Sequence, residues 1–128
     1  MWLRDVILTF LLTAVAFAAP SSSAVAAELL MFEDAGCPYC RRWHTEIGPG
    51  YGKSAEGQRA PLRRIDIRAE LPQGVQLSRR VTITPTFVLV DQGREIGRVA
   101  GYVGAEFFYE VLDEVMRRLP AASVGEAK

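Results

Sequence analysis

The apolar positions divide the chain into a leader at its N-terminus and a patterned domain behind it. Val6 to Ala19 is a run of 14 residues in which only two threonines are polar. Arg4 precedes this run, and Ala24-Val25-Ala26 follows it as an A-x-A sequence typical of signal-peptide cleavage. The run is shorter than the roughly 20 apolar residues of a transmembrane helix. We therefore predict a signal peptide over residues 1–26; an anchor that is not cleaved is the alternative.

Behind the leader, apolar residues recur with the periods of strands and helices. Glu28 to Glu33 is mostly apolar, which predicts a strand that is central to a sheet. A helix is expected from Pro38 to Ile47, ended by Gly48-Pro49-Gly50, with a short helical piece within residues 51–59. Leu62 to Ile67 alternates between apolar and charged residues, as a strand with one wet face does. Two strands joined through a helix by short links should be parallel.

Two further strands are expected in the second half of the domain. Thr86 to Val90 is a strongly β-prone run. Asp91-Gln92-Gly93-Arg94 predicts a hairpin turn that leads into a strand from Glu95 to Ala100. Before them, Gln73 to Arg80 predicts a short helix.

The last element is the clearest helix of the chain. Acidic Glu106 lies near its start and Arg117 near its end, which matches the helix dipole, and Pro120 stops it. We expect its apolar stripe to pack into the core, and residues 121–128 to form a disordered tail. The stripe consists of Phe107, Phe108, Val111, Leu112, Val115, Met116 and Leu119.

Composition limits the class of protein. Removing residues 1–26 would leave one compact domain over residues 27–120, too small for two cores. The whole chain carries 15 basic and 15 acidic side chains and one histidine. Since Arg4 and Asp5 would leave together, the domain stays neutral, and nothing in its charge favours nucleic acid.

The candidate chemistry lies at Cys37 and Cys40, the only two cysteines of the chain. Cys37 is expected at the start of a helix, where free backbone N–H groups and the helix dipole favour a thiolate. Pro38 would take the first helical position, with Tyr39 beside it, and both would tune the site. Cys40, almost one turn further on, can close a small disulfide with Cys37. This spacing suits a nucleophilic thiol, Cys37, and a resolving thiol, Cys40.

Two alternatives compete with a redox role for these cysteines. An exported protein with two cysteines usually holds them in one structural disulfide. Such a bridge gains most when it closes a long loop, and this one would close almost none. The second alternative is a metal-handling chaperone in which Cys37, Cys40 and His44 bind a metal with one open position. We expect His44 to be an ordinary surface residue and assign no residue to a metal.

The order strand–helix–strand–helix–strand–strand–helix, with Cys-x-x-Cys after the first strand, resembles the thioredoxin fold. The resemblance implies an α/β domain with a four-stranded mixed sheet flanked by helices. Thr84-Pro85-Thr86 strengthens it, because thioredoxin-like proteins have a cis X-Pro at this position, facing the cysteines. By this resemblance Thr84 and Pro85 would bind substrate, exposing backbone that an extended partner segment can pair with.

Within this superfamily the domain is most similar to the small periplasmic thioredoxins of bacterial sulfur-oxidation systems (SoxS-type). The likeness implies a periplasmic thiol–disulfide oxidoreductase that reduces exported protein disulfides or a sulfur-carrier protein. It also implies electrons from a membrane thiol reductase and no cofactor beyond the Cys37–Cys40 pair. A disulfide oxidant or isomerase is the alternative within this class, because the fold does not fix the direction of electron flow. The residues that carry the likeness are Met31-Phe32-Glu33, Gly36 to Trp43, Ala60 to Arg64, Thr84 to Val90 and Gly101-Tyr102.

Two departures from related proteins limit what the resemblance implies. Met31 stands where thioredoxins have a buried aspartate that accepts the proton of the resolving thiol, so Glu33 or water would have to replace it. The basic and acidic residues with which glutaredoxins hold glutathione are replaced by Asp34, Gly36 and Val103-Gly104-Ala105. Glutathione is therefore not expected as the dedicated cosubstrate.

Overall fold

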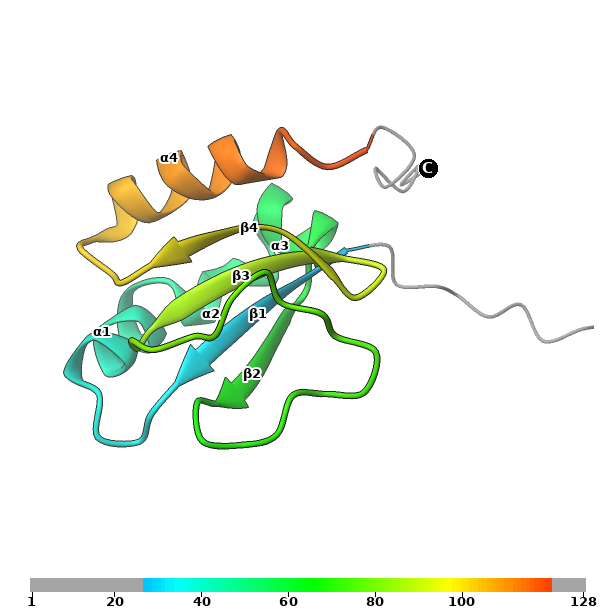
Figure 1. The fold of residues 1–128 in the computed structure, drawn as a ribbon. Helices are drawn as coiled ribbons and strands as arrows, with labels where there is room; N and C mark the ends of the chain where they lie inside the picture. Colours follow the sequence, from blue (N-terminus) through cyan, green and yellow to red (C-terminus); the bar gives the residue numbers. More distant parts are fainter. Residues whose placement is uncertain (1–26, 121–128) are drawn as a thin grey trace, which may run out of the picture.

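The computed structural model describes residues 27–120, so the predicted signal peptide and tail lie outside the described residues. A four-stranded sheet in the order β2-β1-β3-β4 forms the centre of the domain (Figure 1). Within residues 27–120, no helix is both long enough and apolar enough to cross a membrane. The elements in chain order are β1 (Ala27–Glu33), α1 (Pro38–Glu46), α2 (Gly48–Tyr51), α3 (Ala55–Arg59), β2 (Leu62–Asp66), β3 (Thr86–Asp91), β4 (Arg94–Ala100) and α4 (Ala105–Met116).

The pairing of the strands confirms the predicted mixed sheet. β1 and β2 run parallel, as the helix-linked pair should, whereas β1–β3 and β3–β4 are antiparallel. The turn between β3 and β4 places Gln92 and Gly93 at φ values of 50° and 80°. Two consecutive positive φ angles match the right-handed twist of a tight hairpin, and glycine adopts the second without strain.

The two faces of the sheet are covered differently (Figure 1). On the helix face, α1 and α4 pack through Trp43 and Phe108 onto Leu29, Met31 and Phe87 of the sheet. On the loop face, residues 67–85 cross the sheet as an irregular segment. Alternate residues of β1 point to opposite faces, so its apolar run is buried on both sides. The buried residues of the loop face are Leu30, Phe32, Ile65, Val81, Val88 and Val90, with Ile67, Val75 and Leu77 packed against them.

The helix predicted over Gln73 to Arg80 is wrong. Val75 and Leu77, two positions apart, both pack on the loop face, as alternating residues of an extended chain do. Between them, Gln76 donates its backbone N–H to Gly93 O over 2.7 Å and accepts from Glu95 N over 3.1 Å. The backbone of this segment therefore pairs with the β3–β4 hairpin, and the second helix of the predicted order is absent from residues 67–85.

α1 ends at Glu46, one residue before the predicted end, and Gly48-Pro49-Gly50 then begin a separate helical turn that was not expected at these residues. These residues form most of α2, where Pro49 occupies one of the first two helical positions, which tolerate a missing N–H. Tyr51 then anchors this turn in the core and donates its hydroxyl to Ala60 O over 2.8 Å. Burial of that hydroxyl raises the pKa of Tyr51 above its usual range.

The apolar stripe of α4 is only partly in the core. Phe108 and Leu112 are buried, but Phe107 and Val111 are 61% and 40% exposed. The seven apolar positions cover a wider arc than the sheet can bury, so the row formed by Phe107 and Val111 remains at the surface.

Candidate active site

A short turn carries the chain from β1 to the first cysteine. The Asp34 carboxylate accepts the backbone N–H of Gly36 over 3.1 Å, and Asp34 O accepts that of Cys37 over 3.0 Å. Cys37 has extended φ and ψ angles and caps α1, with Pro38 as the first helical residue. The sequence Asp-Ala-Gly-Cys-Pro thus turns the chain and places one sulfur at the positive end of a helix.

The sulfur of Cys37 is surrounded by hydrogen-bond donors. The backbone N–H of Cys40 lies 3.1 Å from Cys37 Sγ. Burial opposes ionisation of Cys37, but hydrogen bonds from the Cys40 and Thr84 side chains and from the N–H groups of Cys40 and Tyr39 outweigh it and lower the pKa of Cys37. These donors stabilise the thiolate, which is the nucleophilic form of cysteine.

Cys40 has the opposite environment, although it lies in the first turn of the helix that Cys37 caps. It is 3% exposed, against 7% for Cys37, and both are free thiols in this structure. Burial, followed by the hydrogen bond and charge of Cys37, raises the pKa of Cys40 to about 11. The structure therefore separates one thiol that ionises easily from one that holds its proton.

The segment before β3 faces the two thiols. The Thr84–Pro85 peptide bond is cis, and the Thr84 side chain is close enough to hydrogen-bond to both Cys37 and Cys40. Pro85 O accepts the N–H of Gly101 over 2.7 Å, which fixes this segment to the end of β4. The side chain of Thr84 thus contacts the thiols, in addition to the expected exposure of its backbone.

Tyr39 is exposed, and exposed apolar residues lie on the segments around it. Tyr39 belongs to the cysteine motif, Ile83 immediately precedes Thr84, and Val103 follows the segment bound to Pro85. Each of the three segments at the site therefore presents one exposed apolar side chain.

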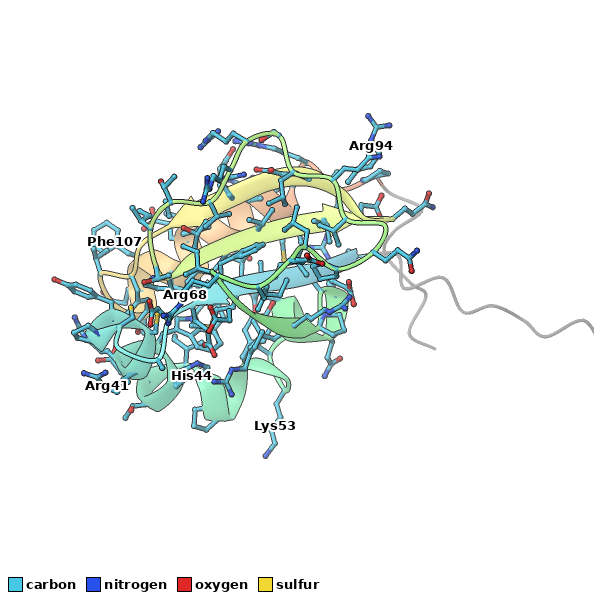
Figure 2. All side chains as sticks on the ribbon, turned by 60° about the horizontal axis from the view of Figure 1, so that its bottom comes forward. Arg41, His44, Lys53, Arg68, Arg94 and Phe107 are labelled. Atoms are coloured by element: carbon cyan, nitrogen blue, oxygen red, sulfur yellow. The ribbon has the colours of Figure 1, made fainter. Side chains whose placement is uncertain are left out.

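The prediction that His44 is an ordinary surface residue is wrong. Its Nε2 lies 2.6 Å from Glu33 Oε2, while Arg64 donates to Glu33 Oε1 over 2.6 and 2.9 Å. This cluster ties α1, which carries His44 (Figure 2), to the end of β1 and the middle of β2. The pKa of Glu33 is lowered because its bonds to Arg64 and His44 outweigh burial, so Glu33 is poorly suited to accept a proton from Cys40.

The positions of Cys37, Cys40 and His44 do not support the alternative of a metal-handling chaperone. Among residues 27–120, no group of three His, Cys, Asp or Glu side chains is arranged to hold a metal ion. His44 is directed to Glu33, so it does not join the two cysteines in one ligand set.

A second polar link between α1 and the rest of the site is not predictable from sequence patterns. Tyr102, which is buried, donates its hydroxyl to Glu46, and Arg42 bonds to Glu46 over 2.7 Å. Burial and the Glu46 carboxylate raise the pKa of Tyr102 to about 12. The four-residue spacing of Arg42 and Glu46 is a recognisable helical pair, but nothing marks Tyr102 as their partner. The link holds α1 against the segment that follows β4.

A dithiol at a helix start, facing a cis-proline on a four-stranded mixed sheet, defines a thiol–disulfide oxidoreductase of thioredoxin type. The family model for the thioredoxin-like domain matches residues 24–116, and the chain belongs to this family.

Solved structures extend the comparison. The chain is similar to the crystal structure of the periplasmic thioredoxin SoxS from Paracoccus pantotrophus in its reduced form. The two are 46% identical with a TM-score of 0.72, over 73% of this chain and 99% of that chain. A thioredoxin of Malassezia sympodialis (Mala s 13) is 16% identical with a TM-score of 0.49, over 76% of this chain and 78% of that one. No curated protein matches the sequence.

Proposed function

We propose that this chain is a periplasmic reductase of protein disulfides, with Cys37 as nucleophile and Cys40 as resolving thiol. The observation that carries the proposal is the placement of the two thiols: Cys37 Sγ caps α1 and lies 3.1 Å from the N–H of Cys40, while Cys40 is buried in the same turn. This placement lowers the pKa of Cys37 and raises that of Cys40. A thiolate attacks disulfides, whereas a thiol that keeps its proton does not compete with it for the substrate.

The reaction has two exchange steps. The Cys37 thiolate attacks one sulfur of the partner disulfide, forms a mixed disulfide and releases the other partner sulfur as a thiolate, which takes up a proton. Cys40 then loses its proton, attacks Cys37 Sγ and releases the second partner thiol. The partner gains two electrons, and the Cys37–Cys40 disulfide that forms has lost them. No cofactor beyond the dithiol takes part.

Thr84 and Pro85 are proposed to bind the partner while these steps occur. The exposed side chains of Tyr39, Ile83 and Val103, on the cysteine motif and on the segments before and after Thr84-Pro85 and β4, would offer it apolar contact. Pro38, at the first helical position, and Tyr39, whose N–H faces Cys37 Sγ, are proposed to tune the nucleophile.

The similarity to the Paracoccus periplasmic thioredoxin supports the cellular setting. We propose that residues 1–26 are an export signal, residues 27–120 the working domain and residues 121–128 a tail. The partners would be exported protein disulfides or a sulfur-carrier protein, and a membrane thiol reductase would supply electrons. Direction of electron flow depends on reduction potential, and for two electrons about 30 mV changes the equilibrium roughly tenfold. A potential more oxidising than that of the proposed partner would favour an oxidant or isomerase instead.

Trapping the mixed disulfide tests the proposal. Cys40→Ser removes the resolving thiol and leaves Cys37, the helix start and Thr84-Pro85 in place. Expressed in the periplasm, this variant should accumulate covalent adducts that disappear on adding dithiothreitol. Cys37→Ser is the matched control and should trap little, because Cys40 is buried with a raised pKa. Adducts with Cys37→Ser in place of Cys40→Ser would contradict the assigned roles.

A further inference from the structure

The loop face carries an open groove of about 540 Å³ that the redox steps do not use. Its apolar lining includes Phe32, Leu77 and Val81, and its charged lining consists of Arg68, Arg79 and Arg80. We call this surface the arginine groove. It exists because residues 67–85 cross the sheet as an irregular segment instead of covering it with a helix (Figure 1).

The arginine groove lies beside the redox site. Phe32 is near the end of β1, and Arg68 Nη2 bonds to Asp34 Oδ1 over 3.0 Å. Asp34 in turn accepts the backbone N–H of Cys37. Figure 2 shows Arg68 at the end of the molecule that also carries Arg41 and His44 of α1. A segment bound in the groove would therefore lie next to the turn that presents Cys37.

The charge of the groove is only partly neutralised. Arg68 is balanced by Asp34 and by Asp66, which lies 3.5 Å away. Arg79 and Arg80 are exposed and make no ion pair with any residue in the range 27–120. The backbone of Arg79 is held in place, because Arg79 O accepts the guanidinium of Arg98, which is itself paired with Glu95. Two cations without a counterion among residues 27–120 thus border an apolar surface.

We propose that the arginine groove binds an acidic and apolar segment of the redox partner, adjacent to the disulfide that the partner presents to Cys37. This inference rests on the proposed function. Carboxylates would pair with Arg79 and Arg80, since arginine binds carboxylates with two parallel hydrogen bonds. Apolar side chains of the same segment would cover Leu77 and Leu71, the latter 46% exposed. Charge complementarity of this kind selects partners and speeds their encounter.

Binding can be tested apart from the chemistry in the Cys37→Ser/Cys40→Ser double variant of the full chain. Three synthetic peptides represent the partner segment, each with alanine in place of the partner's reactive cysteine. They differ in the residues next to that alanine, which are Glu and Leu, Gln and Leu, or Glu and Ser. Nuclear magnetic resonance should show the Glu/Leu peptide shifting the amides of residues 67–82. The other two peptides should bind about tenfold more weakly or worse, since each lacks one of the two contacts. Equal binding of all three peptides, binding elsewhere on the domain, or no binding would overturn the proposal.

Charge reversal identifies the arginines responsible. Arg79→Glu/Arg80→Glu should weaken binding of the Glu/Leu peptide by about tenfold or more, with the loss reduced at high salt. Lys53→Glu/Arg59→Glu changes the net charge by the same amount at exposed residues of the α2–α3 region and is the matched control. An equal loss of peptide affinity in the control would show a general effect of net charge and would contradict binding in the arginine groove.

Turnover separates this inference from the proposed function. With cysteine restored at both positions, the groove variant should reduce the neutral disulfide of 2-mercaptoethanol as fast as the unmodified chain. It should reduce a disulfide-bearing Glu/Leu peptide with a several-fold lower kcat/KM. Failure of the unmodified chain to reduce either disulfide would contradict the proposed function. If the unmodified chain and the groove variant reduce both disulfides equally well, the proposed binding role of the arginine groove is contradicted, but the proposed function is not.

Discussion

Different interactions hold the covering elements on the two faces of the sheet. On the helix face, aromatic rings dominate: Phe108 contacts Phe87 and Trp43 with ring centroids 4.8 and 5.7 Å apart. On the loop face, the segment 76–80 is attached by backbone pairing and by Glu95 and Arg98 of β4. The rigid face supports the thiols, whereas the face covered by a loop leaves an open groove. One sheet therefore carries the dithiol at one face and, at the other, the groove that we propose selects partners.

The largest effect should come from the helix face. Phe108→Ala removes the ring shared by several aromatic neighbours and should lower the free energy of unfolding by about 4 kcal/mol. Leu77→Ala, on the loop face, removes a side chain that is only partly buried and should cost about 1–2 kcal/mol. Urea denaturation of both variants measures the difference. Equal losses would show that the loop face is packed as tightly as the helix face.

A smaller loss is expected from the ion pair that holds the loop. Glu95 and Arg98 side chains are 6% and 8% exposed and lie 2.6 Å apart. Glu95→Gln leaves the buried guanidinium of Arg98 without a counterion and should cost about 3 kcal/mol near neutral pH.

The pH dependence of that loss checks its electrostatic origin. Although burial opposes ionisation, hydrogen bonds from Arg98 and Ser78 lower the pKa of Glu95 from 4.5 to about 2. A lowered pKa in the folded state gives stability that is complete above the unfolded pKa and is lost as the pH falls toward the folded one. The difference between the unmodified chain and Glu95→Gln should therefore be constant above about pH 5 and shrink below it. A difference independent of pH would assign the loss to packing.

The smallest effect concerns Thr84, near the end of the segment 67–85 that crosses the loop face. Thr84→Val keeps the shape of the side chain but removes the hydroxyl that lowers the pKa of Cys37. Stability should hardly change, while the pKa of Cys37 should rise. A hydrogen bond is worth about 1 kcal/mol, so the thiolate fraction near neutral pH should fall several-fold. Absorbance of the thiolate at short ultraviolet wavelengths, followed across pH, measures this change.

Sequence patterns predicted the elements whose signals are local. The cysteine at the helix start, Pro38 after it and the Gln92-Gly93 turn each depend on neighbours in the chain, and all three were correct. The relative directions of β1–β2 and of β3–β4 also followed, because a helix-linked pair should be parallel and a hairpin antiparallel. The pairing of β1 with β3 was not predicted.

The features that sequence patterns did not predict depend on contacts between residues that are distant in the chain. Val75 and Leu77 fit a weak helix until the sheet surface and the pairing of Gln76 with the hairpin are known. Phe107 belongs to the helical stripe, but only the width of the sheet leaves it exposed. The position of Glu33 suggests a base for Cys40, yet Arg64, 31 residues away, and His44 occupy its carboxylate.

The central claim is that α1 makes Cys37 the reactive thiol and keeps Cys40 protonated. The most direct test is alkylation of the reduced protein with iodoacetamide across pH, with each cysteine followed separately by mass spectrometry. Cys37 should react first, with its rate rising well below the ordinary thiol pKa of about 8.5, while Cys40 should react appreciably only near pH 11. Faster labelling of Cys40, or one common pH dependence for both thiols, would contradict the account.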